Sequence, residues 1–385
     1  IDYDFGPGKN DTSGPYIQSQ RLTIYKKYYL QLIQNKTAYV CFTDNQQVAP
    51  EYNTDNALER MNKENYIVKL KVNQNLTIKA FDLIRGDITF DLNLIDDPII
   101  IKSDGYPTYH FANVIDDYLM QITHVIRGEE WIPSLPKHIV LYKSFGWKVP
   151  QFCHLPLLLN PDKSKLSKRQ GDVAVERFLN QGYLKDALIN FVALLGWHPK
   201  NNQEIFNLDD LIKLFSLDRI NKSGAIFDVE KLNWMNREYI KKMGDKKFEK
   251  IIQKILTEKN ITQPKINITT ISLFCKNRVS CLNQIWDEIK CFYNKPKFNV
   301  DKLKNFNYVD LFKLWTEELK NIDHISEDNI NAVILKTKKD LNISGKNLFL
   351  PLRIVLIGKS HGADLFTIIS ILGIKETIHR IKIEK

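Results

Sequence analysis

The period of the apolar residues changes along this chain, and the change limits what it can fold into. In the first half, short strand-like runs such as 67–72 and 99–101 lie among helical patterns. After residue 172 the pattern becomes helical, and beyond Gly244-Asp245 strand character disappears. The sequence therefore predicts an α/β layer, interrupted by an inserted lobe that contains strands, followed by an all-α region.

Several elements can be placed by their period and their end signals. We expect a helix at 19–32 with Ser19 as N-cap and a helix at 229–243 with Asp228 as N-cap. Further segments expected to be regular are a strand at 88–94 and helices at 136–147 and 183–195. The section that follows the first helix is polar and rich in turns, so no element is placed there.

A basic segment in the middle of the chain has the pattern of a phosphate-handling loop. Lys165-Leu166-Ser167-Lys168-Arg169 follows the apolar run 157–159. Two ammonium groups beside a small hydroxyl suit a loop that closes over a polyphosphate, where they follow charge onto an α-phosphate and a departing pyrophosphate. Taken alone, the same five residues also fit a solvated surface loop.

A second group of residues suits the binding of an acid. Arg127 follows a short apolar strand and precedes a glycine, so it can present its guanidinium to a carboxylate or phosphate. Tyr109 offers a phenol for a second bond to the same carboxylate, and Glu130 and Trp131 suit ribose or amine contacts and an aromatic wall. Taken singly, Arg127 also fits a surface ion pair, and Tyr109 and Trp131 fit core aromatics.

The two segments together resemble one enzyme family. Residues 165–169 resemble the Lys-Met-Ser-Lys-Ser loop of class I aminoacyl-tRNA synthetases, in a form similar to the glutamyl branch. Residues 107–131 resemble the glutamyl-tRNA synthetase segment that ends in Arg-x-Glu-Glu-Trp. Shorter resemblances extend the likeness over nearly the whole chain, at 14–21, 85–88, 222–228, 231–236, 350–353 and 358–362.

The resemblance implies a role for each matching residue. Tyr109 and Arg127 would hold the carboxylates of glutamate, and Trp131 would line the amino-acid pocket. Four residues would contact ATP: Glu130, Leu158, Lys165 and Lys168. Leu158 would contact adenine through its backbone, and the two lysines would also act in catalysis.

The resemblance also implies a domain plan. Residues 1–160 would be the remainder of a Rossmann-like catalytic domain with an acceptor-binding insertion at about 20–100. Residues 161–244 would carry the signature loop and the stem-contact domain, and residues 245–385 an α-helical anticodon-binding domain. None of the eight histidines lies in the His-x-Gly-His signature of class I synthetases. We therefore expect a sequence that is incomplete at its N-terminus by about one hundred residues.

The expected function is that of a glutamate–tRNA ligase. Its partners would be L-glutamate, ATP with Mg²⁺, and tRNA(Glu), and it would act as a monomer in a bacterial cytoplasm or a mitochondrial matrix. The formal charge of +10 agrees with a polyanionic partner. Two alternatives stay open: a tRNA-binding protein without catalysis, and a glutaminyl-tRNA synthetase, whose family ends in β-barrels.

Other classes of protein and site are disfavoured. No apolar run approaches the roughly 20 residues that span a bilayer. The five scattered cysteines suit reduced thiols, and Cys41, followed by Phe42-Thr43, makes the zinc site of some relatives doubtful. Gly358-Lys359-Ser360 resembles part of a P-loop, but Arg353 stands where that motif needs glycine, so a helix-ending turn is expected.

Overall fold

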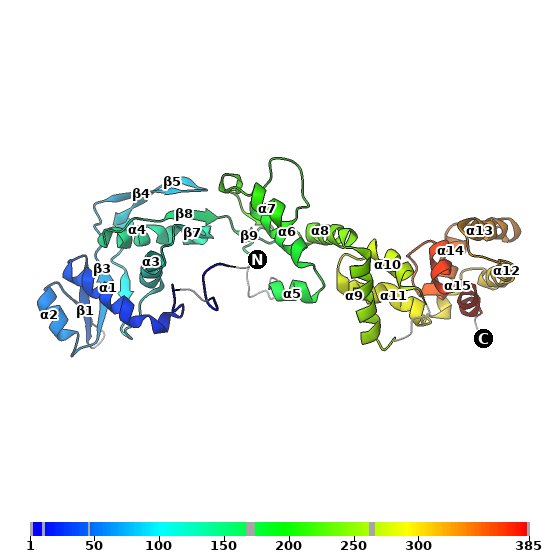
Figure 1. Cartoon of the computed structure of the whole chain (residues 1–385), viewed down its shortest axis with the longest axis horizontal. Coiled ribbons are helices and arrows are strands. Elements are labelled where there is room, and N and C mark those ends of the chain that lie inside the picture. The colour runs from blue at the N-terminus through cyan, green and yellow to red at the C-terminus, as the bar shows by residue number, and fades with distance from the viewer. Residues whose placement is uncertain (1–2, 10–11, 45–46, 167–173, 262–265, 383–385) are drawn as a thin grey trace. The chain divides into compact units, whose positions relative to one another are not determined.

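The structure is a computed structural model that describes residues 3–9, 12–44, 47–166, 174–261 and 266–382 (Figure 1). Its contacts divide the chain into two compact units. The first unit comprises residues 1–166, 193–203 and 211–227, and the second comprises 167–192, 204–210 and 228–385. The domain boundaries expected from the sequence, after residues 160 and 244, stay predictions.

The first unit contains an antiparallel four-stranded sheet. Its strand order is β2 (Gln47–Glu51), β1 (Ala38–Asp44), β3 (Tyr66–Leu70) and β6 (Ile99–Ile101). Helices α1 (Leu22–Gln34) and α3 (Tyr109–Leu119) share one hydrophobic core with this sheet. Strands β3 and β6 were predicted. Strands β1 and β2 and helix α2 (Thr54–Arg60) were missed in the turn-rich section. Strand β1 is short, and Val40, Cys41 and Phe42 are all buried, so it lacks a regular alternation of buried and exposed residues.

A second four-stranded sheet of the first unit carries the parallel strands. Its order is β5 (Gly86–Asp91), β4 (Thr77–Asp82), β8 (Gln151–Leu155) and β7 (His124–Gly128). Strands β7 and β8 are parallel, and helix α4 (Leu135–Ser144) connects them as a βαβ unit. Leu135 and Ile139 of α4 pack against Ile78 and Phe152 of the sheet. The predicted strand at 88–94 ends earlier, because 92–94 form a 3-10 turn.

A short parallel pair of strands follows in the same unit. β9 (Leu158–Leu159) pairs with β10 (Ala225–Ile226). A Cβ atom on Gly224 would lie 2.7 Å from the Leu159 side chain and 3.1 Å from the Leu157 carbonyl, so this close approach requires glycine. Helices α5 (Val175–Asn180), α6 (Lys185–Gly196) and α7 (Leu208–Leu214) occur between these strands in sequence, and α6 corresponds to the helix predicted at 183–195.

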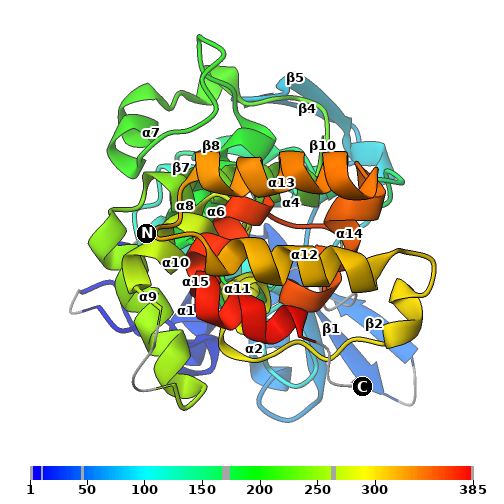
Figure 2. The ribbon, with the colours of Figure 1, turned by 90° about the vertical axis from the view of Figure 1, so that its right-hand side faces the viewer.

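The described part of residues 229–382 in the second unit holds helices and no strand (Figures 1 and 2). The helices are α8 (Val229–Lys242), α9 (Asp245–Glu258), α10 (Ile268–Lys276), α11 (Ile285–Tyr293), α12 (Tyr308–Lys320), α13 (Glu327–Leu341), α14 (Lys346–Ile357) and α15 (Leu365–Ile381). One core joins them, with Phe248, Trp315 and Leu348 fully buried. The predicted all-α region is therefore confirmed.

The helix ends test three predictions. Asp228 caps α8 by accepting the N–H groups of Glu230 and Lys231, as expected. Gly358 ends α14 in the left-handed region with a φ of 72°, which confirms a helix-ending turn. Ser19 was wrong as an N-cap, since it lies in a short 3-10 turn and α1 begins at Leu22.

Two further predictions concern membranes and thiols. Among the described helices, none combines the length and the apolar character needed to cross a membrane. All five cysteines are buried free thiols.

Candidate active site

The predicted site residues lie in the first unit, at the carboxyl ends of parallel strands. Arg127 is the fourth residue of β7, and Glu130 and Trp131 follow in the 3-10 helix η3 (Glu129–Ser134). Tyr109 is the first residue of α3, and Leu158 lies in β9, shortly after β8 ends. Loops that follow parallel strands converge at one edge of a sheet, where ligands bind in α/β folds.

The three residues expected to bind the amino acid meet there. The rings of Tyr109 and Trp131 have their centroids 4.9 Å apart, and Tyr109 is 47% exposed. The guanidinium carbon of Arg127 lies 5.8 Å from the Trp131 ring and 5.4 Å from the Phe152 ring. The alternative of a core aromatic is wrong for Tyr109, because nearly half of its surface faces solvent.

Arg127 is held by two histidines. Its Nε donates to Nε2 of His154 at 3.1 Å, and its Nη1 lies 3.2 Å from Nδ1 of His138. Its Nη2 is buried and has no hydrogen-bond partner in the described residues. Burial lowers the pKa of Arg127, while Tyr109 and Asp117 act to raise it. The alternative of a surface ion pair is wrong, since no ion pair of the described residues involves this arginine.

A buried carboxylate stands behind His154. Asp82, at the end of β4, accepts the ring Nδ1–H of His154 at 2.7 Å and the backbone N–H groups of Ile84 and Arg85. Both Asp82 and His154 are fully buried. Burial alone would raise the pKa of Asp82, but these hydrogen bonds outweigh it and lower that pKa.

The predicted ATP-contacting residues lie beside this group. Nζ of Lys165 is 3.3 Å from Oε1 of Glu130, and both side chains are well exposed. A Cβ atom on Gly128 would lie 2.0 Å from the Glu130 carboxylate, so a larger residue at 128 would displace this flexible side chain. The predicted residue Lys168 lies outside the described residues.

The approach to Lys165 is a tight turn stabilised by its own hydrogen bonds. The Asp162 carboxylate accepts the N–H and the hydroxyl of Ser164, at 2.9 and 2.6 Å. The Ser164 carbonyl accepts the N–H of Asn160 at 2.8 Å, and the Leu158 carbonyl accepts the N–H of Leu166 at 2.9 Å. This hairpin-like loop brings Lys165 next to the strand that carries Leu158.

An ion pair connects this loop to neighbouring segments of the first unit. Arg85 bonds to the Glu129 carboxylate and donates to the Lys222 carbonyl at 2.6 Å. The second oxygen of Glu129 accepts the N–H of Leu157 at 3.2 Å. The segments around Arg85 and Lys222, both within the family resemblance, therefore support the strand that leads into the signature loop.

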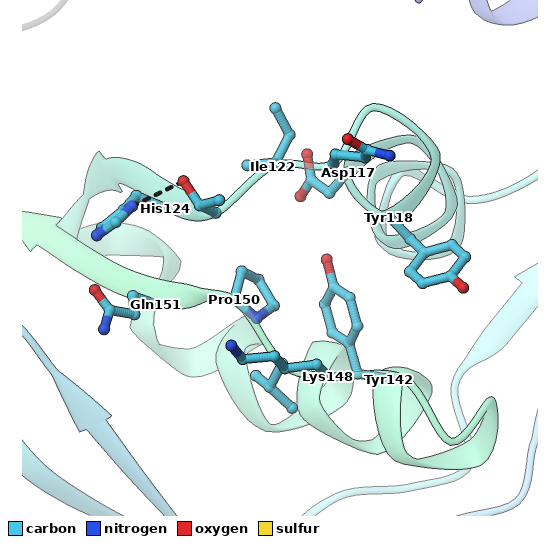
Figure 3. A pocket seen from close by; sticks show the side chains of 11 residues that line it. Asp117, Tyr118, Ile122, His124, Tyr142, Lys148, Pro150 and Gln151 are labelled. Carbon is cyan, nitrogen blue, oxygen red and sulfur yellow. Dashed lines mark hydrogen bonds between the residues drawn. The ribbon is translucent and has the colours of Figure 1, made fainter.

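A separate cavity of about 410 Å³ opens at the other end of the parallel strands (Figure 3). His124 and Gln151, the first residues of β7 and β8, line it. Asp117 and Tyr142 face the same space. Burial, with help from Asp116, raises the pKa of Asp117 to about 6. None of the predicted site residues lines this cavity.

Sequence reasoning missed Asp82, His138 and His154. The signal was weak but present: His154 interrupts an apolar strand at 152–155, and His138 lies on the buried face of α4. Ionisable residues on buried faces are uncommon unless they are paired, so their presence marks a candidate site.

Comparisons with known proteins agree over nearly the whole chain. The family model "tRNA synthetases class I (E and Q), catalytic domain" matches residues 1–67 and 53–234, and the model "Anticodon binding domain" matches 228–384. The chain is 40% identical to a glutamate–tRNA ligase of Clostridioides difficile, over 96% of this chain and 81% of that ligase. It is 39% identical to a glutamate–tRNA ligase of Finegoldia magna, with the same two coverages.

Solved structures give the same result. A glutamate tRNA ligase of Elizabethkingia meningosepticum, crystallised in complex with its amino acid, superposes with a TM-score of 0.82 at 32% identity. That superposition covers 96% of this chain and 84% of the other. A glutamate-tRNA synthetase of Elizabethkingia anophelis gives a TM-score of 0.83 at 31% identity, over 98% and 85% of the two chains.

Proposed function

The chain belongs to the glutamate–tRNA ligases, and from this premise we propose that Tyr109, Arg127 and Trp131 bind L-glutamate while Lys165 and Lys168 act on ATP. The enzyme is a class I tRNA synthetase that joins glutamate to tRNA, and its family uses ATP. Its catalytic domain contains mixed sheets and is followed by a helical anticodon-binding domain, which implies tRNA as a partner.

The observation that carries the glutamate site is the unused donor of Arg127. A buried N–H group without a partner is uncommon in a folded protein and needs an explanation. The Nη2 group of Arg127 is such a donor, and the Tyr109–Trp131 wall stands beside the guanidinium. A carboxylate placed there would accept a charge-assisted hydrogen bond from Nη2 and balance the positive charge.

The proposed chemistry has two steps. A glutamate carboxylate oxygen attacks the α-phosphorus of ATP, a P–O bond forms, and pyrophosphate leaves with the electrons of the broken bond. A terminal ribose hydroxyl of tRNA then attacks the acyl carbon and releases AMP. Ammonium groups at Lys165 and Lys168 would stabilise the charge that moves onto pyrophosphate in the first step.

Two residues would receive the nucleotide. Glu130 holds Lys165 at 3.3 Å, and the phosphates of ATP would compete with this exposed carboxylate for the ammonium group. The backbone of Leu158 would contact adenine, as the family resemblance implies. Its carbonyl already accepts the N–H of Leu166, so the bound state would add a contact or exchange one.

The metal ion, the location and the mode of tRNA recognition are further proposals. Mg²⁺ would arrive with ATP, whose phosphates supply hard oxygen ligands, so a dedicated protein cage is not needed. We propose a bacterial cytoplasm as the location, because the relatives named above are bacterial proteins. The monomeric state stays a prediction. The anticodon-binding unit would read tRNA by stacking on bases and by contacts to phosphates.

The test is glutamate-dependent ATP–pyrophosphate exchange together with charging of tRNA(Glu). Lys165→Ala should lower the exchange rate by about 10²–10³-fold, the usual effect of removing a preorganised charge. Lys163→Asn is the matched control, because it removes another exposed charge from the same turn, at a left-handed position that asparagine tolerates. Equal losses in both variants, or tRNA binding without any exchange, would contradict the proposal.

A further inference from the structure

The protons of the network around Arg127 can be assigned from donor–acceptor logic. Arginine can only donate hydrogen bonds, so each imidazole nitrogen that faces it must be an acceptor without a proton. These acceptors are Nε2 of His154 and Nδ1 of His138. The proton of His154 is therefore on Nδ1, facing Asp82 at 2.7 Å, and the proton of His138 is on Nε2, facing Nδ1 of His110 at 2.9 Å.

Every imidazole of this network is neutral by the same logic. A charged imidazole would carry a proton on both nitrogens: at His138 or His154 the added proton would oppose a donor of Arg127, and at His110 it would oppose the Nε2–H of His138. The environment acts in the same direction: burial lowers the pKa of His138 to about 3, with Arg127 adding to the effect. Burial likewise lowers the pKa values of His154 and His110.

Asp82 fixes this arrangement without forming an ion pair with Arg127, and its carboxylate acts on the charge of that arginine only through space. Its oxygens accept the ring Nδ1–H of His154 and three backbone N–H groups, those of Ile84, Arg85 and His154. A full imidazole ring separates the carboxylate from the guanidinium. Asp117 acts on Arg127 only electrostatically, because in the described part of the chain no carboxylate forms an ion pair with that arginine.

The consequence concerns selectivity. A guanidinium held by neutral acceptors keeps its orientation and a charge that no direct ion pair compensates, so a ligand carboxylate can become its direct counter-ion. A carboxamide carries no charge. In one of its two orientations its NH₂ group would face an N–H donor of Arg127, and no hydrogen bond would form. A site whose buried donors are left unpaired by the wrong ligand discriminates more strongly than a site that reads size alone.

We propose that His138 and His154 are positioning residues that make this site select a carboxylate over a carboxamide, by orienting Arg127 without neutralising it. Asp82 holds His154 in the tautomer that this role needs. The inference rests on the proposed function, because it takes the side-chain carboxylate of glutamate, the group that glutamine replaces by a carboxamide, as the ligand of Arg127. It assigns no contact with the substrate to either histidine.

The first test does not depend on activity. Long-range proton–nitrogen NMR spectra of the full chain with labelled histidine report the tautomer of each imidazole, and single His→Gln variants assign the signals. At pH 7 we expect His154 to be protonated on Nδ1 only, and His138 and His110 on Nε2 only. An imidazolium, or the reversed tautomer, at His138 or His154 would overturn the proposal.

The second test compares two variants of equal shape. His138→Gln keeps a neutral acceptor, whereas His138→Glu places a carboxylate against Arg127. In the exchange assay, the ratio of the Ki for glutamine to the KM for glutamate should stay within about 3-fold of wild type in the first variant. In the second it should fall by about 10-fold or more, through KM rather than kcat.

The outcomes separate the two claims. Equal ratios in the Gln and Glu variants would refute the selectivity role, even with full exchange activity. Absence of glutamate-dependent exchange in the wild-type protein, together with the expected tautomers, would refute the proposed function and leave the neutral support of Arg127 standing. If His138→Glu fails to fold, which thermal unfolding would reveal, the tautomers in the wild-type chain decide.

Discussion

The two units each contain an arginine enclosed by other groups, and the two arginines use their donors differently. Arg380 of the second unit is 2% exposed and donates from Nη1 to the carbonyls of Leu356 and Cys291. Its Nη2 donates to the Phe292 carbonyl at 3.3 Å, and its Nε to Glu376 at 2.7 Å. Arg127 of the first unit leaves Nη2 without a partner in the described residues. Arg380 has all three nitrogens engaged, whereas Arg127 leaves one buried donor unused, which we propose binds a ligand.

The partners explain the difference. Cys291 and Phe292 lie at the end of α11, and Leu356 at the end of α14, where helical carbonyls lack intrahelical partners. These ends also carry partial negative charge, so a cation there is stabilised. Arg380, near the end of α15, therefore joins three helices. Arg127 is held by imidazoles that carry no charge. We therefore expect Arg380 to contribute mainly to stability and Arg127 mainly to binding.

The largest expected effect is on stability at Arg380. Arg380→Met keeps an unbranched apolar stem but leaves three buried carbonyls without a donor, at about 1–3 kcal/mol each before relaxation. We expect the second unit to lose about 3–5 kcal/mol. Hydrogen exchange of amides in α14 and α15 measures this loss within that unit. A loss below about 1 kcal/mol would contradict the view that Arg380 stabilises the fold of the second unit.

The next effect is on activity at Arg127. Arg127→Gln should lower kcat/KM for glutamate in the exchange assay by about 10²–10³-fold, since a charged partner of the substrate is lost. Stability should change by less than about 1 kcal/mol, because losing the hydrogen bonds to His138 and His154 is offset by removing a buried charge that has no ion-pair partner in the described residues. Hydrogen exchange of α4 amides is the stability control. A variant that keeps its activity but unfolds easily would show that Arg127, too, serves the fold.

The comparison also shows what could be predicted from the sequence. Signals within a few residues were readable, as at Asp228, which caps α8, and at Gly358, which ends α14. The meeting of Tyr109, Arg127 and Trp131 was expected from family resemblance, because spacing alone left core and surface alternatives open.

The remaining contacts join residues that are far apart in sequence. His154 meets Asp82 across 72 positions, and Arg380 meets Cys291 across 89. No local pattern encodes such pairs, since each depends on which strands and helices become neighbours. Strand β1 was missed for a related reason. The burial of its residues depends on pairing with β3, and the short run 38–44 contains no local pattern that predicts this pairing.

A smaller effect tests the neutral support of Arg127 through pH. The folded-state pKa of His138 is lowered to about 3, so below pH 6.5 the unfolded chain takes up a proton that the folded chain does not. Stability is therefore present above that pH and is lost as the pH falls. Between pH 7 and pH 5 the loss from this group is about 2 kcal/mol. His138→Gln should lose about 2 kcal/mol less than wild type over that range.

Hydrogen exchange of α4 amides, corrected for the intrinsic rate at each pH, measures the two pH profiles of the first unit. If the stability of wild type and of His138→Gln fell equally with pH, the pKa of His138 would not differ between the folded and unfolded chains, contrary to what its burial implies. The same profiles in the second unit serve as a control, because α8 to α15 do not contain His138.

The smallest effect separates the carbonyl contacts of Arg380 from its ion pair. Glu376, one helical turn before Arg380, is 40% exposed, and exposed pairs at this spacing contribute about 0–1 kcal/mol. Glu376→Gln keeps an acceptor for Nε and removes only the charge, so hydrogen exchange in α15 should show a loss below about 1 kcal/mol. A loss as large as that of Arg380→Met would mean that Arg380 depends on its carboxylate partner. The carbonyls at the helix ends would then not be the main partners of Arg380, and the contrast with Arg127 would have to be explained in another way.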